Sequence, residues 1–366
     1  MKIRRQLAIA GCFAAGACAA DAVLAQSPGT VTIYGRLNTG LEHVDVSGDG
    51  GADQNRLSNY RSVLGFRGDE DIGGGLKVVW QIEGSISLDT GSGGIANRDT
   101  RLGLSGPWGT AFAGVWTLPY TSATSAFDPF YPTTAGYMAL MGNGSAPITD
   151  NVQDTSSFDR RQVNQIQYWS PKLAGFSARL AYGVNEETVA ETGAKPWLAS
   201  GSLSYEAGPL LITAAHERHD EYQTAHTTDT ATKIGAAYTW GPARLAGVFE
   251  HLKYGTSSGD LERDAWYVSG TYRVGAGMFK VGYTRADDGE GASDQTVGFF
   301  KSGPHTGSEQ ITVGYEHELS KRTSLQAFYS RIRNESRAVY DFAINEFGIT
   351  AGQRPSVLAA GMRHTF

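Results

Sequence analysis

The chain reads Val31-Thr32-Ile33-Tyr34-Gly35-Arg36-Leu37 near its amino terminus, where odd positions suit an apolar surface and even positions suit water. Successive side chains of a β-strand point to opposite faces, so this alternation predicts a strand with one apolar and one polar face. Segments of about ten residues with this pattern are typical of a membrane-spanning β-barrel. They recur, separated by Gly and Pro turns, as far as Phe366. Lipid cannot hydrogen-bond an open sheet edge, so such a sheet must close on itself.

The composition agrees with many short strands and tight turns. The 366 residues include 47 glycines, and 40% of the residues are hydrophobic. No stretch of about 18 or more apolar residues occurs, so the sequence does not predict a transmembrane helix. The formal net charge of −6 argues against nucleic acid as a partner.

The first 25 residues differ from the rest of the chain. Basic residues at positions 2, 4 and 5 precede an apolar stretch of small residues, Leu7 to Ala20. Small residues at positions 23–25 then match the pattern that a signal peptidase recognises. We therefore expect a signal peptide over residues 1–25 and a barrel domain over residues 26–366.

Both cysteines, Cys12 and Cys18, lie within this expected signal peptide. The mature chain would then have no cysteine. Disulfides, thiolate metal sites and cysteine catalysis are consequently not expected.

The turns give the number of strands. Gly and Pro adopt backbone angles that other residues resist, and Pro ends ladder pairing. Longer polar connections such as 46–59, 287–307 and 334–354 alternate with the short turns. With both chain ends on the short-turn side, this alternation predicts about sixteen strands, a number associated with an aqueous channel. The seven short turns are 68–75, 106–109, 170–175, 207–209, 241–242, 274–277 and 319–322.

Charged and polar residues occupy the faces opposite the apolar ones. Charges at every second position of apolar strands suit a water-filled lumen, although the solvated face of a soluble sandwich is an alternative at this stage. The residues expected to face inward are Arg36, Arg61, Arg67, Lys77, Gln81, Glu83, Arg101, Arg161 and Arg179.

Six blocks in the same order resemble the trimeric general porins of β-proteobacteria, of the Neisseria, Bordetella and Burkholderia type. The blocks are Val31–Gly35, Leu64–Lys77, Trp80–Glu83, Leu102–Thr110, Tyr168–Pro171 and Gly361–Phe366. The resemblance covers the expected mature chain. It implies an all-β, sixteen-stranded antiparallel outer-membrane barrel. The barrel would assemble as a homotrimer in the lipid of the outer membrane and pass ions and small hydrophilic solutes passively.

The resemblance also implies that the third extracellular loop, about 117–159, folds into the lumen and forms the constriction. Its length of roughly 40 residues is typical of a functional loop. Phe366 is expected to be read by the barrel-insertion machinery. The residues expected to line the pore or its constriction are Arg36, Arg61, Arg67, Lys77, Glu83, Arg101, Asp128, Asp150, Asp154, Asp159 and Arg161.

Three positions depart from the family pattern. Val63, Val115 and Gln167 stand where the family usually has basic residues in the pore wall. The anion preference common in the family is expected to be weaker here, because fewer fixed positive charges attract anions less strongly. A channel specialised for one class of solute therefore stays open as an alternative function.

Other functions have less support. His216 and His219 would point to opposite faces of a strand, which does not suit a metal site. The acidic run at 287–290 resembles a loose calcium loop, but a solvated extracellular loop is the better explanation. No Ser/His/Asp arrangement indicates an enzyme, and no cofactor is expected. A surface adhesin or receptor anchored by a barrel would need an additional large domain.

Overall fold

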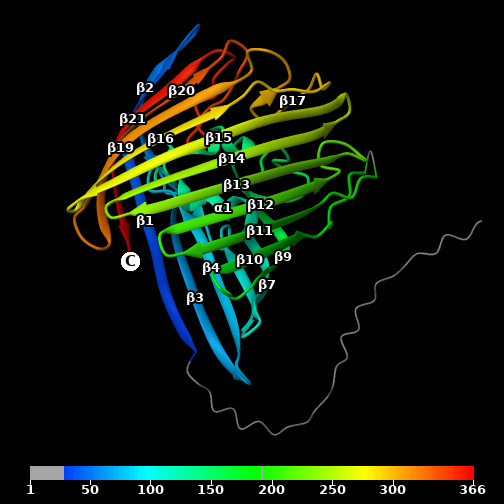
Figure 1. The fold of residues 1–366 in the computed structure, drawn as a ribbon, viewed down its shortest axis with the longest axis vertical. Coiled ribbons are helices and arrows are strands. Elements are labelled where there is room, and N and C mark those ends of the chain that lie inside the picture. The colour runs from blue at the N-terminus through cyan, green and yellow to red at the C-terminus, as the bar shows by residue number, and fades with distance from the viewer. Residues whose placement is uncertain (1–28, 191–192) are drawn as a thin grey trace, which may run out of the picture.

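The computed structural model describes residues 29–190 and 193–366. The expected signal peptide, residues 1–25, lies outside the described residues. The strands are numbered in chain order in Figure 1, which shows them wrapped around a lumen that contains α1.

Nineteen strands of the described chain join one sheet, and sixteen of them form the barrel wall. Of the other three, β2 continues the line of β3, whereas β5 and β8 lie in loops. The wall strands are β1 (Thr30–Ser47), β3 (Ser62–Gly73), β4 (Leu76–Ile86), β6 (Thr100–Gly106), β7 (Gly109–Thr117), β9 (Arg160–Trp169), β10 (Phe176–Gly183), β11 (Trp197–Ala207), β12 (Leu210–Asp220), β13 (Thr228–Trp240), β14 (Ala243–Thr256), β15 (Gly259–Val274), β16 (Gly277–Ala286), β19 (Ser308–Glu318), β20 (Thr323–Asn334) and β21 (Arg354–Thr365).

The sheet closes through β1. One side of β1 pairs with β3 and with β2 (Asp53–Asn59), and the other side pairs antiparallel with β21. The β1–β21 ladder runs from Arg36 opposite Thr365 to Ser47 opposite Arg354. Closure leaves no sheet edge exposed to lipid. The predicted sixteen-stranded antiparallel barrel is therefore confirmed.

The two ends of the barrel differ as expected, with short turns at one end and longer loops at the other. All seven predicted short turns join consecutive wall strands.

At the loop end, two connections are shorter than predicted. Residues 48–52 alone join β1 to β2, and residues 257–258 join β14 to β15. These strands continue as paired hairpins beyond their neighbours, so their backbone groups are satisfied by each other rather than by water.

The alternation of apolar and polar residues in the sequence corresponds to the outer and inner faces of the barrel wall. In β13, Ile234 and Tyr238 are exposed on the outside, whereas Lys233 and Ala237 are buried on the inside. Large apolar side chains repeat on the outside around the barrel, as a lipid-facing belt requires. In the described residues, no helix is both long and apolar enough to span a membrane.

The longest loop, residues 118–159, enters the barrel, and we call it loop 3. It contains α1 (Pro119–Thr124), η1 (Ser125–Phe127), η2 (Tyr137–Ala139), η3 (Met141–Asn143) and β8 (Ala146–Thr149). The remaining short elements of the other loops are β5 (Gly93–Gly94), β17 (Thr296–Val297) and β18 (Phe300–Lys301).

Candidate pore constriction

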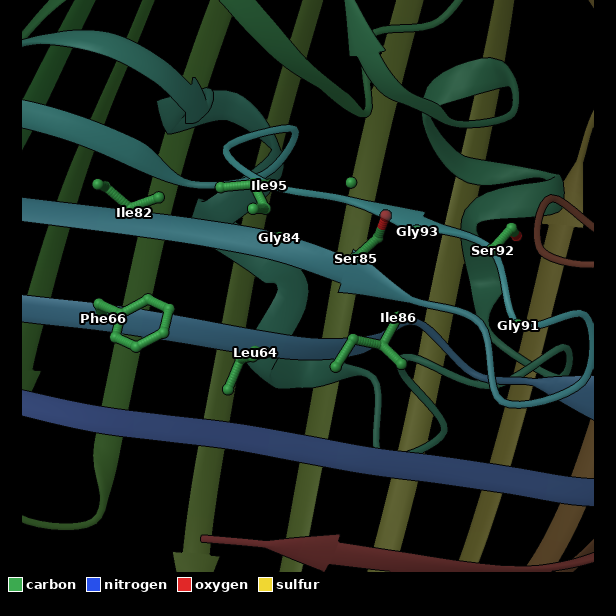
Figure 2. A pocket seen from close by; sticks show the side chains of 11 residues that line it. Leu64, Phe66, Ile82, Gly84, Ser85, Ile86, Gly91, Ser92, Gly93 and Ile95 are labelled. Carbon is green, nitrogen blue, oxygen red and sulfur yellow. The ribbon is translucent and has the colours of Figure 1, made fainter.

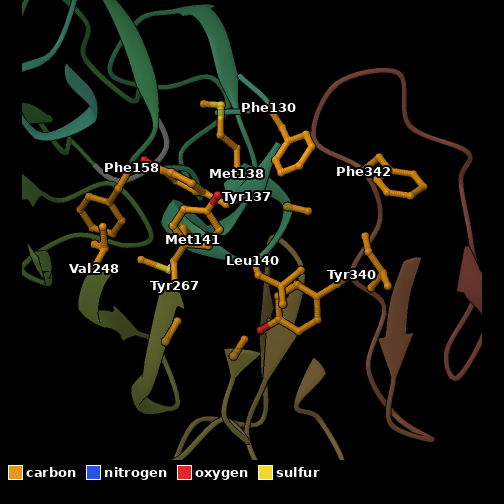
Figure 3. Close-up of a cluster of buried hydrophobic side chains, with 14 of the residues drawn as sticks. Phe130, Tyr137, Met138, Leu140, Met141, Phe158, Val248, Tyr267, Tyr340 and Phe342 are labelled. Carbon is orange, nitrogen blue, oxygen red and sulfur yellow. The ribbon is translucent and has the colours of Figure 1, made fainter. Parts of the chain in front are cut away.

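Loop 3 is held inside the barrel by an apolar face. Tyr137, Met138, Leu140 and Met141 are buried in one cluster with inward-facing residues of the β14–β20 wall. Figure 3 shows them gathered near Val248 and Tyr267, with Tyr340 and Phe342 of the residue 335–353 loop close by. Burial of this apolar surface stabilises the docked position of the loop.

Glycines on the inner wall make room for two loop aromatics. A β-carbon on Gly235 of β13 would occupy the space of the Phe127 ring, and one on Gly314 of β19 would lie 2.8 Å from the Phe130 ring. The rings therefore sit directly against the backbone of the sheet. This fit fixes where the loop meets the wall.

Polar anchors complete the attachment of loop 3 to the wall. Glu250 of β14 accepts hydrogen bonds from the Tyr120 hydroxyl at 2.7 Å and from the Gly142 amide at 2.8 Å. Glu250 also forms a fully buried ion pair with Arg263, whose guanidinium donates to the Tyr340 hydroxyl. This pair ties loop 3, the wall and the residue 335–353 loop together. Sequence reasoning missed it, although Glu250 and Arg263 both interrupt the apolar pattern at inward positions.

The opposite, polar face of loop 3 lies toward β1, β3 and β9. Arg61 donates to the Ser145 hydroxyl at 2.5 Å and to the Tyr131 hydroxyl at 3.4 Å. Arg161 donates to the Pro147 carbonyl at 2.6 Å. The arginines thus contact the loop through neutral oxygens, not through its carboxylates.

Several predicted arginines meet in one part of the wall. Arg36 donates to the Arg61 carbonyl at 2.9 Å. Arg161 forms an ion pair with Asp99 at 2.7 Å, and Arg98 forms one with Glu83 at 2.9 Å. Arg98 and Asp99 had not been identified from the sequence, because they precede β6 in a loop where the strand alternation gives no facing rule.

Burial and neighbouring charges together shift the pKa values of Arg98, Asp99 and Tyr131. Burial, followed by the charge of Arg161, lowers the pKa of Arg98. Burial opposes ionisation of Asp99, but the charge and hydrogen bond of Arg161 lower the pKa of this carboxyl. Burial likewise opposes ionisation of Tyr131, but the charges of Arg61, Arg161 and Arg98 lower the pKa of its hydroxyl. The group therefore carries an excess of positive charge.

A second set of basic side chains lies nearer the short-turn end. Arg67, Gln81 and Arg101 are register neighbours across β3, β4 and β6. The Arg101 guanidinium lies 4.5–4.8 Å from the ring centres of Phe112, Trp116 and Trp169, and that of Arg179 lies 4.7 Å from Trp169. Stacking on aromatic faces orients the guanidiniums while leaving their charge unneutralised.

Lys77 is the most peripheral of the predicted basic residues. Its side chain is about half exposed beside the turn that joins β3 to β4, and its ammonium pairs with Asp69 at 3.0 Å. It therefore lies near the short-turn rim.

The predicted acids of loop 3 do not contact the predicted arginines. Buried Asp128 accepts from the amides of Phe130 and Tyr137 and from the Tyr267 hydroxyl. Buried Asp159 lies 3.4 Å from the Lys233 ammonium. Burial raises the pKa of each carboxyl to about 6.

The other two predicted acids lie farther along loop 3. Asp150 accepts from the amides of Val152 and Gln153, and Asp154 is exposed with a positive φ of 45°. Glu83 and Asp99, from the wall and its neighbouring loop, are the carboxylates that face the arginines.

The three positions that depart from the family pattern have different surroundings. Val63 is buried opposite Arg36 in the β1–β3 ladder. Gln167 is buried and donates to the Thr117 carbonyl at 3.0 Å. Val115 lies at an irregularity of the β7–β9 ladder, opposite Thr100 of β6.

His219 and the acidic run pack against or bind neighbouring groups of the protein itself. His219 is stacked between Phe158 and Tyr222, each with ring centres 4.3 Å away, whereas His216 lies on the opposite, exposed face. Asp288 of the acidic run accepts from the backbone amides of residues 305–307. Across the described residues, no group of three or more His, Cys, Asp or Glu side chains is arranged to hold a metal ion.

The closed barrel, the inward loop and the arginine-rich wall together define a pore of the outer-membrane type. Comparisons with known proteins show which family it belongs to. The chain belongs to the Gram-negative porin family, which it matches over residues 7–337. It is 28% identical to the outer membrane porin protein 32 of Delftia acidovorans over 359 residues, 95% of this chain and 97% of that protein.

Solved structures agree with this assignment. The anion-selective porin from Comamonas acidovorans superposes with a TM-score of 0.76 at 25% identity, over 92% of this chain and all of that one. OmpT of Vibrio cholerae, solved in a trimer form, superposes with a TM-score of 0.68 at 17% identity, over 92% and 99% of the two chains. The protein is thus an outer-membrane porin for passive diffusion of ions and small solutes, and it is not an enzyme.

Proposed function

We propose that the pore favours anions. Loop 3 and the arginines near its polar face, Arg36 of β1, Arg61 before β3, Arg98 before β6 and Arg161 of β9, form its selective constriction. The observation that carries this proposal is the excess of basic groups where the polar face of the loop meets the wall. Among the described residues, Arg98 pairs there with Glu83 and Arg161 with Asp99. Arg36 and Arg61 donate to neutral oxygens.

The packing of loop 3 supports this location. Its apolar face is buried against β14–β20, so solutes pass on its polar side, where Tyr131 and Ser145 meet Arg61. Fixed positive charges raise the local concentration of anions in a narrow lumen. Neutral loop oxygens add hydrogen-bonding capacity without cancelling that charge.

Liposome swelling tests this proposal and separates it from a channel specialised for one class of solute. A general, anion-favouring pore should admit sugars in order of their size and should admit a small organic anion faster than a cation of equal size. A single favoured solute that enters faster than smaller neutral sugars would instead support the specialised channel.

We further propose that the protein is a homotrimer in the outer membrane. An apolar groove of about 440 Å³ lies on the outside of β3 and β4, bounded by the loop that carries Ile95. Figure 2 shows Leu64, Phe66, Ile82 and Ile95 along it. Ile95 is 87% exposed in the isolated chain and lies at the loop end of the wall, where a second protomer would cover it.

The subunit count of the detergent-extracted protein, from light scattering, tests the oligomer. Ile95→Asp should shift the population toward monomers, because contact between protomers would bury the new charge. Ile148→Asp provides a matched control, since Ile148 is an exposed isoleucine of loop 3. Monomeric wild-type protein would contradict the proposal.

A further inference from the structure

Three aromatic side chains form a shelf on the inner face of β7 and β9. The ring centres of Phe112, Trp116 and Trp169 are 5.0–5.5 Å apart, and each pair of rings meets edge to face. Phe112 is buried, whereas the two tryptophans are partly exposed. Trp116 precedes Thr117, which is paired with Arg161, and Trp169 ends β9. The shelf therefore runs from the constriction toward the short-turn end.

Two guanidiniums lie against this shelf. The Arg101 guanidinium is 4.5 Å from the Trp116 ring centre and 4.7 Å from that of Trp169. The Arg179 guanidinium is also 4.7 Å from the Trp169 ring centre. Arg179 is exposed at a position of β10 directly opposite Trp169 in the ladder. Since both guanidiniums contact one indole ring, a single small ligand can reach both of them.

Neither guanidinium is neutralised by a carboxylate. Within residues 29–190 and 193–366, Arg101 and Arg179 have no side-chain hydrogen bond or ion pair. The Nε and Nη1 atoms of Arg101 are buried, which leaves its Nη2 atom as the donor that a ligand can reach. Stacking on an aromatic face orients a guanidinium but occupies none of its N–H donors.

These two features indicate a class of anion. A carboxylate accepts charge-assisted hydrogen bonds from guanidinium N–H groups. A planar aromatic ring stacks on a guanidinium face, and Arg179 has one face toward Trp169 and the other toward the lumen. An aliphatic carboxylate would make only the first contact, and a neutral aromatic molecule would make only the second. An aromatic carboxylate of the size of benzoate would make both.

We propose that Arg101, Arg179 and Trp169 form a subsite that holds aromatic carboxylates during their passage. The carboxylate would accept from Nη2 of Arg101, and the ring would stack on the lumen side of the Arg179 guanidinium. Trp116 and Trp169 keep the two guanidiniums in place. The subsite depends on the proposed function, because it names the class of anion that an anion-favouring pore would hold longest.

Block of the chloride current through single reconstituted channels tests the proposal. Benzoate and cyclohexanecarboxylate have the same charge and nearly the same size, but only benzoate has a planar aromatic ring. Benzoate should block at a concentration about two- to five-fold lower, which is the factor expected of one exposed cation–π contact. Benzamide, which has the ring without the charge, should block much more weakly than either carboxylate.

Arg179→Lys separates stacking from charge. Lysine keeps the positive charge but has no planar surface, so the preference for benzoate over cyclohexanecarboxylate should disappear. The reversal potential in a potassium chloride gradient should stay the same, which also shows that the variant forms a normal pore. Arg273→Lys is the matched control, since Arg273 is an arginine near the short-turn end of β15 that pairs with Glu318. This control should keep the preference for benzoate.

Three outcomes would overturn the proposal. Equal block by the two carboxylates in the wild type would mean that the pore responds to charge alone. Equal block by benzamide and benzoate would mean that the carboxylate makes no contact. An unchanged benzoate preference in Arg179→Lys would mean that the ring does not stack on Arg179. The reversal potential of the wild type reports separately on the anion preference, so a failure of the proposed function is distinguishable from a failure of the subsite.

Discussion

Gly35 and Phe366 exchange two backbone hydrogen bonds, of 3.0 and 3.1 Å, beside the last rungs of the β1–β21 ladder. The Phe366 ring also lies in the space that a β-carbon on Gly35 would need. The first and last wall strands are therefore joined by backbone pairing and by ring packing at the short-turn end. Closure of the barrel depends on this junction.

Deletion of Phe366 should lower the yield of inserted barrel, because the deletion removes both the ring and two hydrogen bonds of the closing ladder. The measurement is the fraction of membrane-extracted protein that migrates as a heat-modifiable barrel. Phe366→Tyr, which retains an aromatic ring, is the control and should insert normally. Normal insertion of the truncated chain would mean that Phe366 is an ordinary interface aromatic.

Gly235→Ala should loosen loop 3, because the new methyl group overlaps the Phe127 ring. Overpacking of this kind costs about 1–3 kcal/mol. We expect a lower melting temperature and noisier single-channel currents. Gly247→Ala on β14 is the matched control, since its β-carbon would meet only the Tyr267 carbonyl at 3.7 Å. Equal behaviour of the two variants would show that the Phe127 contact does not hold the loop.

Asp128 should make the stability of the loop depend on pH. Burial raises the pKa of its carboxyl to about 6, compared with about 3.9 in an unfolded chain. The folded state therefore binds this proton more tightly. The resulting stabilisation is complete below about pH 3.9 and is lost as the pH rises through about 6.

Asp128→Asn cannot titrate, so the melting temperature of the wild type relative to this variant should rise as the pH falls from about 7 to about 4. Thermal melts of both proteins across this range are the measurement. A difference that stays constant, or that grows toward high pH, would contradict the assigned role of Asp128.

The alternation of the sequence was sufficient to predict the strands, the turns and the closure, because lipid and lumen impose opposite requirements on successive side chains. The length of loop 3 marked it as functional. The family resemblance implied that this loop folds into the lumen, and the structure agrees. Which wall residues its side chains meet could not be predicted, because loops have no facing rule. Asp128 and Asp159 were expected to line the constriction but are buried against loop amides and Lys233. The apolar run 137–141 was the available signal that this loop packs against the wall.

Val63→Arg should increase anion preference, because it adds a positive charge directly opposite Arg36. The increase should be largest at low salt, where the screening length is about 30 Å at 0.01 M. Reversal potentials in potassium chloride gradients at two ionic strengths provide the test. Val46→Arg, at an inward position near the loop end of β1, is the control and should have a smaller effect. No change in the Val63 variant would place position 63 outside the permeation path.

The reversal potential of Arg36→Gln/Arg61→Gln tests the central claim most directly. Among the residues that the structure describes, both guanidiniums donate only to neutral oxygens, so their removal changes the charge of the constriction without leaving a carboxylate unpaired. Arg337→Gln, which removes a loop arginine that donates to the Pro304 and Ser302 carbonyls, is the control. The wild type and the control should be anion-selective in a potassium chloride gradient, and the double variant should shift clearly toward cations. An unchanged reversal potential in the double variant would contradict the claim that these arginines set the selectivity of the pore.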